Sequence, residues 1–336
     1  MINYCTLFNS RYLSRGLAMY RSLEKHCNDF HLYIFAFDEL CYDTLCNLNL
    51  RYATIISLSE FEDEHLLSIK PTRMENEYCW TCTPSVIRYS INEYQLSSCT
   101  YLDADLLFFS DPAILIQEME ERSVLITEHR YTPRHDQSVT SGIYCVQFIC
   151  FKNTEEGMRV LDWWRNACLE WCFCRVEDGK FGDQKYLDDW MTRFTGIHEL
   201  KALGGGVAPW NIQQYDFAFR DQQLYGKDLA SSSFFPVVFY HYHGFKYAEA
   251  NSFIPTNGYD LSSNDLHFIY QPYVKALKSA DKELAKLNLK YHFHEVQKIE
   301  RIGKSPRRMI LLYIKGQFRQ FYHSSYFFRK WPFKSI

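Results

Sequence analysis

The sequence lacks the features of secreted and membrane-spanning proteins. Its first residues have no charged start followed by an apolar core, so no signal peptide is predicted. No apolar run approaches the ~18 residues that a membrane-spanning helix needs. The 12 cysteines are scattered and form no framework of the kind found in short secreted domains. We therefore expect a reduced, cytoplasmic protein in which most cysteines act as small hydrophobic residues.

Standard zinc-binding spacing is also absent. Cys79 and Cys82 form a C-x-x-C pair, and Cys168, Cys172 and Cys174 lie further along the chain. Together they match no common zinc pattern. A structural role for these cysteines is therefore favoured over a zinc or redox site.

Acidic residues are missing from residues 301–336, whereas nine basic residues are present there. The rest of the chain, with 28 basic and 40 acidic residues, carries a charge of -12. A basic, aromatic end suits an anionic membrane surface, with Phe327, Phe328 and Trp331 entering the acyl boundary. We therefore expect peripheral attachment to the inner face of the membrane; the alternative is a tail packed on the acidic body. Nucleic acid is not expected as a partner, because the body is acidic.

The composition supports a large core, since 47% of residues are hydrophobic and 17% aromatic. Predicted strands alternate with predicted helices, which indicates an α/β fold with a mostly parallel sheet. We expect a catalytic domain over 1–250 and a helical, basic and aromatic extension over 251–336. The strands are predicted at 2–8, 32–37, 53–58, 100–109, 123–127, 142–151 and 237–241, and the helices at 12–26, 84–94, 155–174, 183–192 and 275–287.

Two carboxylates, Asp103 and Asp105, stand two residues apart in an apolar run. In extended geometry they share one face. Crowded carboxylates are costly unless a cation neutralises them, and Mg2+ or Mn2+ accepts such oxygens while leaving positions for phosphate oxygens. The pattern predicts a metal-diphosphate site; the alternative is a strand end with two solvated aspartates.

A late strand ends in Tyr240-His241-Tyr242-His243-Gly244-Phe245-Lys246. An imidazole can complete an oxygen-rich metal site, and either His241 or His243 could supply it. Gly244 lets the backbone approach a phosphate, and Lys246 offers a point charge for a diphosphate. The alternative is a pair of surface histidines after a strand.

Two further segments contain polar groups next to glycine. Gly182 is followed by Asp183 and Gln184, a pattern that also fits a plain helix cap. Residues 204–206 are three glycines, and Trp210 and Asn211 follow them. This second segment could border a sugar pocket or form a mobile loop.

The order of these motifs resembles GT-A type nucleotide-diphospho-sugar transferases, especially the family-8-like retaining glycosyltransferases. The resemblance spans roughly residues 2–248, and residues 101–112 (YLDADLLFFSDP) are its strongest part. It implies a Rossmann-like three-layer α/β/α sandwich that binds a nucleotide-diphosphate sugar, with UDP as nucleotide, and transfers the sugar to a glycan or lipid-linked acceptor with retention. Such a reaction belongs to polysaccharide biosynthesis.

The resemblance also implies roles for individual residues. Donor contacts fall on Thr6, Tyr12, Arg88, Asp103, Ala104, Asp105, Gly244 and Lys246, and Tyr12 stacks on the base. Asp103, Asp105 and His241 hold the metal. Gln184 faces the anomeric carbon, whereas Asp183 orients the acceptor hydroxyl. Trp210 and Asn211 bind the acceptor.

The family's N-x-G segment has two possible registers here, Cys145-Val146-Gln147 and Thr140-Ser141-Gly142, so the sugar-hydroxyl contacts of this strand stay open. Two other functions compete with glycosyl transfer. A sugar nucleotidyltransferase also uses paired aspartates with Mg2+, but it would carry a glycine-rich basic loop near its start, and residues 8–11 (FNSR) are not one. A catalytically retired glycan- or lipid-binding protein would have little need of Asp103, Asp105 and His241.

Overall fold

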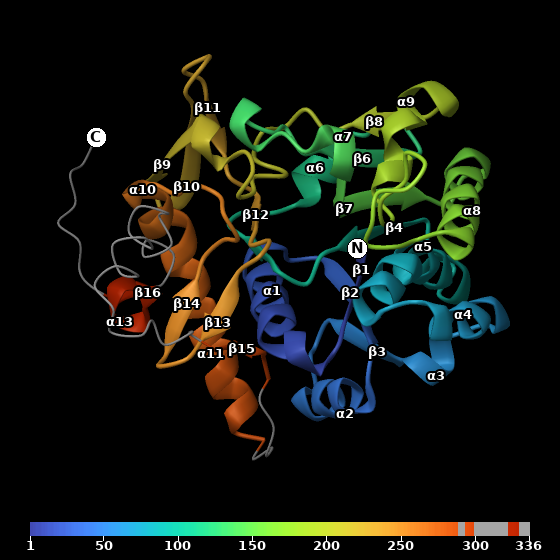
Figure 1. Cartoon of the computed structure of the whole chain (residues 1–336), viewed down its shortest axis with the longest axis horizontal. Helices are drawn as coiled ribbons and strands as arrows, with labels where there is room; N and C mark the ends of the chain where they lie inside the picture. The colour runs from blue at the N-terminus through green and yellow to red at the C-terminus, as the bar shows by residue number, and fades with distance from the viewer. Residues whose placement is uncertain (288–292, 299–321, 329–336) are drawn as a thin grey trace.

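The computed structural model of the chain describes residues 1–287, 293–298 and 322–328 (Figure 1). Its largest sheet has seven strands in the order β3-β2-β1-β4-β7-β6-β8. All of them run parallel except β7, which is antiparallel to both of its neighbours. The strands are β1 (Ile2–Phe8), β2 (Phe30–Ala36), β3 (Ala53–Ser57), β4 (Ser98–Leu102), β6 (Val124–Glu128), β7 (Tyr144–Lys152) and β8 (Ile197–Glu199).

Both faces of this sheet are covered, because successive side chains of a strand point to opposite faces. In β1, Tyr4 and Phe8 enter one hydrophobic core, whereas Cys5 and Leu7 enter a second core on the other face. The first core contains residues of α1 (Leu13–His26), α2 (Glu39–Leu48) and α11 (Gln271–Ala285). The second contains residues of α3 (Leu58–Phe61), α4 (Glu64–Ile69), α5 (Glu75–Glu93), α8 (Glu155–Glu170) and α9 (Trp190–Arg193). The predicted three-layer α/β/α sandwich with a mostly parallel sheet is confirmed.

Helix α5 begins at Glu75 rather than at residue 84, so Pro84 lies inside the helix and not in its first turn. A proline there cannot donate to the carbonyl four residues back, and this is costly in an isolated helix. The packing of α5 against α8 and β1 outweighs that preference. The expected helix over 183–192 is also different, since Asp183 and Gln184 form a turn before the 3-10 helix η4 (Lys185–Asp189) and α9.

The strand predicted over 100–109 is divided. Strand β4 ends at Leu102, residues 103–105 turn, and β5 (Leu106–Phe108) leaves the main sheet to pair antiparallel with β12 (Phe239–His241). The turn replaces the extended geometry on which the shared face of the two aspartates was expected. His241 pairs with Leu106 in this ribbon, so it lies directly beside that turn.

Several elements had no clear signal in the sequence. Strands β9 (Tyr215–Arg220), β10 (Gln223–Asp228) and β11 (Phe234–Pro236) form a separate antiparallel sheet. Short elements complete the described part: η1 (Ser10–Tyr12), η2 (Lys70–Thr72), α6 (Ala113–Gln117), η3 (Pro133–His135), α7 (Ser138–Ser141), η5 (Ile212–Gln214), α10 (Ser263–Asp265) and the π-helix η6 (Leu266–Tyr270).

The domain boundary expected at residue 250 falls inside a hairpin. Strand β13 (Lys246–Ala248) pairs antiparallel with β14 (Ser252–Ile254), and β15 (Val296–Gln297) and β16 (Tyr322–His323) flank them. Helix α11 packs on α1, and its apolar residues belong to the first core. Residues 252–285 are therefore part of the main body, because their apolar side chains and those of α1 bury each other.

The basic residues of the predicted tail, and Trp331, lie outside the described residues. Phe327, which was expected to enter a membrane, is 1% exposed in α13 (Ser324–Phe327) and packs against Phe253. Phe328 is exposed. Within the described ranges, no helix combines the length and the apolarity needed to cross a bilayer.

Candidate functional site

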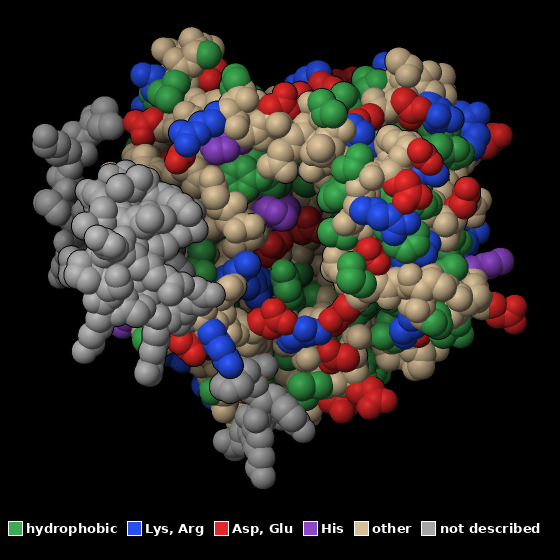
Figure 2. Space-filling view, in the orientation of Figure 1, with side chains coloured by type: hydrophobic (Ala, Val, Ile, Leu, Met, Phe, Trp, Pro, Cys, Tyr) green, Lys and Arg blue, Asp and Glu red, His purple; other side chains and the backbone are tan. Residues whose placement is uncertain are grey.

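A cleft of about 630 Å3 opens where the sheet changes its direction of winding. Strand β1 lies between β2 and β4, so the segments that follow β1 and β4 diverge at their carboxyl ends. Ligands of open α/β sheets bind at such points. The loop after β1 and the turn after β4 both line the cleft. Figure 2 shows the hollow near the centre of one face, with acidic and histidine side chains at its base.

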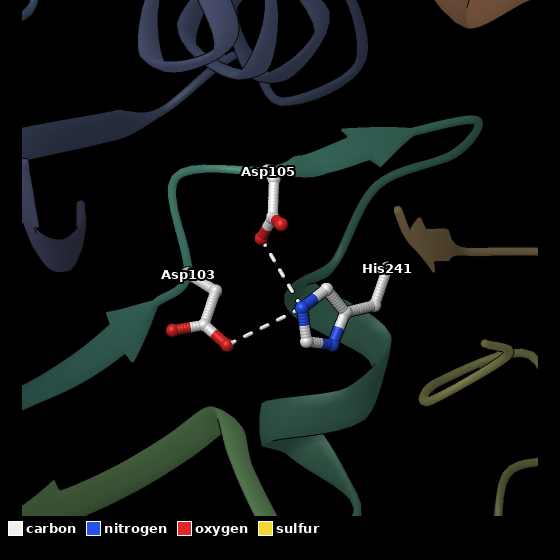
Figure 3. A group of neighbouring side chains, drawn as sticks. All are labelled: Asp103, Asp105 and His241. Atoms are coloured by element: carbon white, nitrogen blue, oxygen red, sulfur yellow. Dashed lines mark ion pairs between the residues drawn. The ribbon is translucent and has the colours of Figure 1, made fainter. Parts of the chain in front are cut away.

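Asp103, Asp105 and His241 meet at the base of the cleft (Figure 3). His241 Nε2 lies 3.1 Å from Asp105 Oδ1 and 3.6 Å from Asp103 Oδ2. One potential ligand atom from each residue falls within 4.8 Å of the others. His243 lies outside this group, with its ring centroid 5.6 Å from that of His241. The structure thus brings together the three residues expected to hold a metal.

A buried amide fixes the orientation of the His241 ring. Gln147 on β7 places Oε1 2.7 Å from His241 Nδ1, so Nδ1–H donates and Nε2 faces the two aspartates. Gln147 belongs to one of the two registers considered for the sugar-hydroxyl contacts, and the choice between Cys145-Val146-Gln147 and Thr140-Ser141-Gly142 stays open. Two carboxylates and an imidazole presented in this way are a donor set that suits Mn2+ or Mg2+.

The electrostatics of the three residues reflect their crowding. Burial raises the pKa of Asp103 to about 6, and Asp105 adds to this rise although His241 opposes it. Burial acts in the same direction on Asp105, but the adjacent His241 outweighs it and brings the pKa of that carboxyl down to about 2. Burial disfavours a charge on His241, yet Asp105 raises the pKa of its imidazole. Without a bound cation, His241 therefore serves as the counter-charge of Asp105.

Asp183 and Gln184 lie on another wall of the cleft. Gln184 Nε2 donates to the carbonyl of Ser141 at 2.6 Å. Asp183 is 5% exposed, and burial together with the charge of Asp103 raises its pKa to about 7. These two neighbours thus differ: Gln184 presents an amide that is fixed at one end, whereas Asp183 is a carboxyl with little solvent around it.

The loop after β1 forms the wall that contains Tyr12. Asp38 holds the start of this loop, because it accepts from both the backbone N–H and the hydroxyl of Ser10, at 2.9 and 2.8 Å. Asn9 Nδ2 donates to Glu75 at the start of α5. Arg11 forms ion pairs with Glu75 and with Glu295. Tyr12 is 41% exposed and faces the cleft from this loop.

Four residues expected to contact the donor do not line the described cleft. Thr6 is fully buried in β1. Arg88 lies on the α8 side of α5, where its Nε donates to Asp162 at 2.6 Å. Gly244 forms the turn after β12 with a φ of +75°, and Lys246 follows in β13. Ala104, in contrast, does line the cleft.

Trp210 and Asn211, expected together on the acceptor side, have different surroundings. Trp210 lines the cleft, and its ring lies 5.4 Å from that of His241. Asn211 is 1% exposed: Nδ2 donates to the carbonyls of His129 and Gly206, and Oδ1 accepts from Ala208 N. Asn211 is therefore a support for the loop, because all its polar atoms are bonded to backbone. This corrects its expected role in acceptor binding.

Other cleft residues were not identified from the sequence. Glu75 and Trp80 come from the first turns of α5, which begins earlier than expected. The aromatic wall opposite includes Tyr131 and Tyr259, and Gln137 donates to the Tyr259 hydroxyl at 2.9 Å. Tyr131 follows β6, a parallel strand whose carboxyl end lies on the same edge as that of β4. Its position just after a predicted strand could therefore have identified it as a cleft residue from the sequence.

The chain is 31% identical to YfnD of Bacillus subtilis (strain 168) over 284 residues, which cover 82% of this chain and 88% of YfnD. No protein-family model matches the sequence. Among solved structures, the bifunctional glycosyltransferase WbbM aligns with a TM-score of 0.50 at 10% identity, over 85% of this chain and 51% of WbbM. This chain therefore spans about half the length of WbbM. The galactosyltransferase LgtC aligns with a TM-score of 0.49 at 10% identity, over 87% of this chain and 97% of LgtC.

The identity to YfnD over most of both chains shows common descent, and the likeness to WbbM at 10% identity is one of fold. The chain belongs to the same protein family as YfnD, and it has the GT-A fold of nucleotide-sugar transferases.

Proposed function

We propose that the protein is a metal-dependent glycosyltransferase that moves a sugar from a nucleoside-diphosphate sugar to an acceptor hydroxyl. The observation that carries this proposal is the group of Asp103, Asp105 and His241 at the base of a cleft large enough for such a donor. The cleft lies at the carboxyl ends of β1 and β4, where the segments that follow the two strands diverge, and a nucleotide is expected at such a point. UDP is the proposed nucleotide, and a glycan or lipid-linked saccharide the proposed acceptor.

Different residues of the cleft would bind the metal, the nucleotide and the acceptor. Asp103, Asp105 and the Nε2 of His241 would hold Mn2+ or Mg2+, and such an ion acts as a Lewis acid toward a departing diphosphate. Tyr12, exposed on the loop after β1, would stack on the base. The backbone of Ala104 would pass beside the sugar and diphosphate. Trp210 would present a flat apolar surface to the acceptor.

Gln184 and Asp183 are the proposed catalytic residues. The bond from Gln184 Nε2 to Ser141 leaves Gln184 Oε1 as the free acceptor, so a partial positive charge at the anomeric carbon would be stabilised there. Asp183 would orient the acceptor hydroxyl. Because an amide is a poor nucleophile, we propose retention through a front-face reaction in which the leaving phosphate takes the proton of the acceptor hydroxyl.

The test is release of nucleoside diphosphate from a panel of nucleotide sugars by the full-length protein with Mn2+. We expect Asp105→Asn to lower the rate at least about 100-fold, because it removes a metal ligand. Asp162→Asn is the matched control, since Asp162 pairs with Arg88 outside the cleft; it should keep the wild-type rate.

Two outcomes would overturn the proposal. One is an Asp105→Asn protein that turns over any donor at the wild-type rate. The other is a wild-type protein that releases pyrophosphate from a nucleoside triphosphate and a sugar phosphate but does not cleave nucleotide sugars, as a nucleotidyltransferase would.

A further inference from the structure

The described cleft has a surplus of negative charge, although its proposed ligand is itself anionic. Its lining includes the carboxyl groups of Glu75, Asp103, Asp105, Asp183 and Glu295. Among lysines and arginines, the described lining contains Arg11, and Glu75 and Glu295 already pair with it; His241 is already the counter-charge of Asp105. Lys246 and Arg88, which were expected to serve the diphosphate, do not line the described cleft. A donor with two phosphates would bring further negative charge into this cleft, and a positive charge besides the metal would stabilise it.

Arg15 supplies a charge of this kind directly behind the cleft wall. It lies on α1, one turn after Tyr12, and is 5% exposed. Its guanidinium carbon is 4.4 Å from the centroid of the Tyr12 ring. Its Nη2 donates to the carbonyl of Phe245 at 3.0 Å, in the turn that follows His241 and Gly244. Arg15 therefore links the loop after β1 to the turn after β12.

No carboxylate of the described residues lies within 4 Å of the Arg15 guanidinium. A buried charge without a close counter-ion is costly, and the contacts with aromatic rings offset only part of that cost. Burial alone would lower the pKa of Arg15, but the nearby Tyr273, Tyr12 and Asp105 raise it. The guanidinium thus stays charged, and Asp105, whose charge acts on it, is one of the candidate metal ligands.

We propose that Arg15 is a positioning residue that provides the fixed positive charge of the diphosphate subsite. It holds Tyr12 and the Phe245 carbonyl in place, and its field favours an anion between Tyr12 and Asp105. The counter-ion that the described residues lack is then the diphosphate of the bound donor. This inference rests on the proposed function, because it assumes that a nucleoside diphosphate occupies the cleft.

The experiment compares a nucleoside diphosphate with its uncharged nucleoside. Titrations of the full-length protein with UDP in the presence of Mn2+, and with uridine, are carried out on wild type, Arg15→Gln, Arg15→Lys and Arg21→Gln. Arg21 lies on the same helix and pairs with Glu24 and Glu283, so its variant is the matched control. The same titrations are repeated with CDP, GDP, ADP and TDP and with their nucleosides, in case the protein binds a base other than uracil.

We expect Arg15→Gln to weaken diphosphate binding at least about tenfold while nucleoside binding changes less than about threefold, because a nucleoside has no charge for Arg15 to attract. Arg15→Lys should recover part of the loss, and Arg21→Gln should bind as wild type does. If Arg15→Gln fails to fold, Arg15→Lys decides alone: it keeps the charge, so diphosphate and nucleoside binding should then differ from wild type by less than about threefold.

Equal losses for diphosphate and nucleoside, in Arg15→Gln or Arg15→Lys, would overturn the inference and leave Arg15 as a mere support for Tyr12. Wild-type affinity for the diphosphate in Arg15→Gln would overturn it as well. If wild-type protein binds none of the diphosphates, the proposed function itself fails, and the inference fails with it.

Discussion

Single residues of the cleft combine burial with polar chemistry. Asp183 is nearly inaccessible and close to Asp103, whereas Asn211 has each polar atom bonded to backbone. Burial raises the cost of a charge and also raises the cost of a lost hydrogen bond. The two residues therefore respond differently to substitution, and each gives a measurable prediction.

Asp183→Asn should stabilise the metal-free protein increasingly as the pH rises. The folded-state pKa of Asp183, about 7, lies above the ordinary 3.8. Its protonated form therefore contributes stability that is complete below about pH 4 and is lost as the pH rises through 7. Asparagine avoids that loss, so the difference should reach up to about 4 kcal/mol at pH 8. Urea unfolding with a chelator at pH 4, 6 and 8 measures it; a difference that does not change with pH would contradict the prediction.

Asn211→Ala should destabilise the fold rather than weaken acceptor binding. It removes three buried hydrogen bonds and leaves the His129 and Gly206 carbonyls without this donor. The expected loss is about 2–4 kcal/mol in the free energy of unfolding. Denaturant unfolding measures this loss. Acceptor titration of the folded variant measures acceptor binding, which should not change. Wild-type stability together with a raised acceptor KM would restore the role predicted from the sequence.

Helices and strands from distant parts of the chain position the candidate site. The β5–β12 ribbon carries His241 to the turn after β4, and α11 covers α1, on which Arg15 lies. Tyr273 of α11 stacks on Tyr242 with the ring centroids 3.6 Å apart. The segment after residue 250 is thus joined to the site through packing, although it does not line the described cleft except at Tyr259 and Glu295.

A chain that ends at Asn264 should therefore not fold, contrary to the expectation of a separate catalytic domain over 1–250. It lacks Tyr273, Val274, Leu277 and Leu284, which α11 buries in the first core. At about 1.5–3 kcal/mol for each apolar side chain, the loss equals the whole stability of a typical domain. Circular dichroism and thermal unfolding test this, with removal of residues 329–336 as the control. A cooperative unfolding transition in the chain of 264 residues would refute it.

At the scale of the molecule, the described residues place the main sheet between two hydrophobic cores, and the cleft opens at one edge of this sheet. Opposite walls of the cleft come from segments as distant as Tyr12, Asp183 and His241. A ligand that contacts all of them binds only the folded chain, so binding and global stability are linked.

Mn2+ together with the preferred nucleoside diphosphate should therefore raise the melting temperature. At 100 times the dissociation constant, the stabilisation is about 2.7 kcal/mol. For a chain of 336 residues that corresponds to a rise of about 4 °C. Differential scanning fluorimetry measures the rise. Asp105→Asn should abolish it, and an undiminished rise in that variant would argue against Asp105 as a metal ligand.

The sequence by itself determined the layers of the fold and the strand ends that carry the candidate metal ligands. Alternating apolar residues in strands such as β1 specify two buried faces, and this pattern is local, so the α/β/α sandwich was predictable. Asp103 and Asp105 were also identified beforehand, because paired carboxylates are recognisable side by side in the chain. The residues alone left His241 and His243 open, and His241 was what the family resemblance implied. Their binding of a metal stays a prediction.

Tertiary structure alone decided what surrounds that group. Arg88 pairs with Asp162 across two helices, Asn211 bonds to the loop of His129, and Arg15 reaches Phe245 from a segment 230 residues away. The boundary at residue 250 was wrong for the same reason, since α11 is held by α1 from the other end of the chain. Local periodicity states which face of an element is apolar, but not which distant element will cover it, because that depends on packing between surfaces that the chain brings together only when it folds.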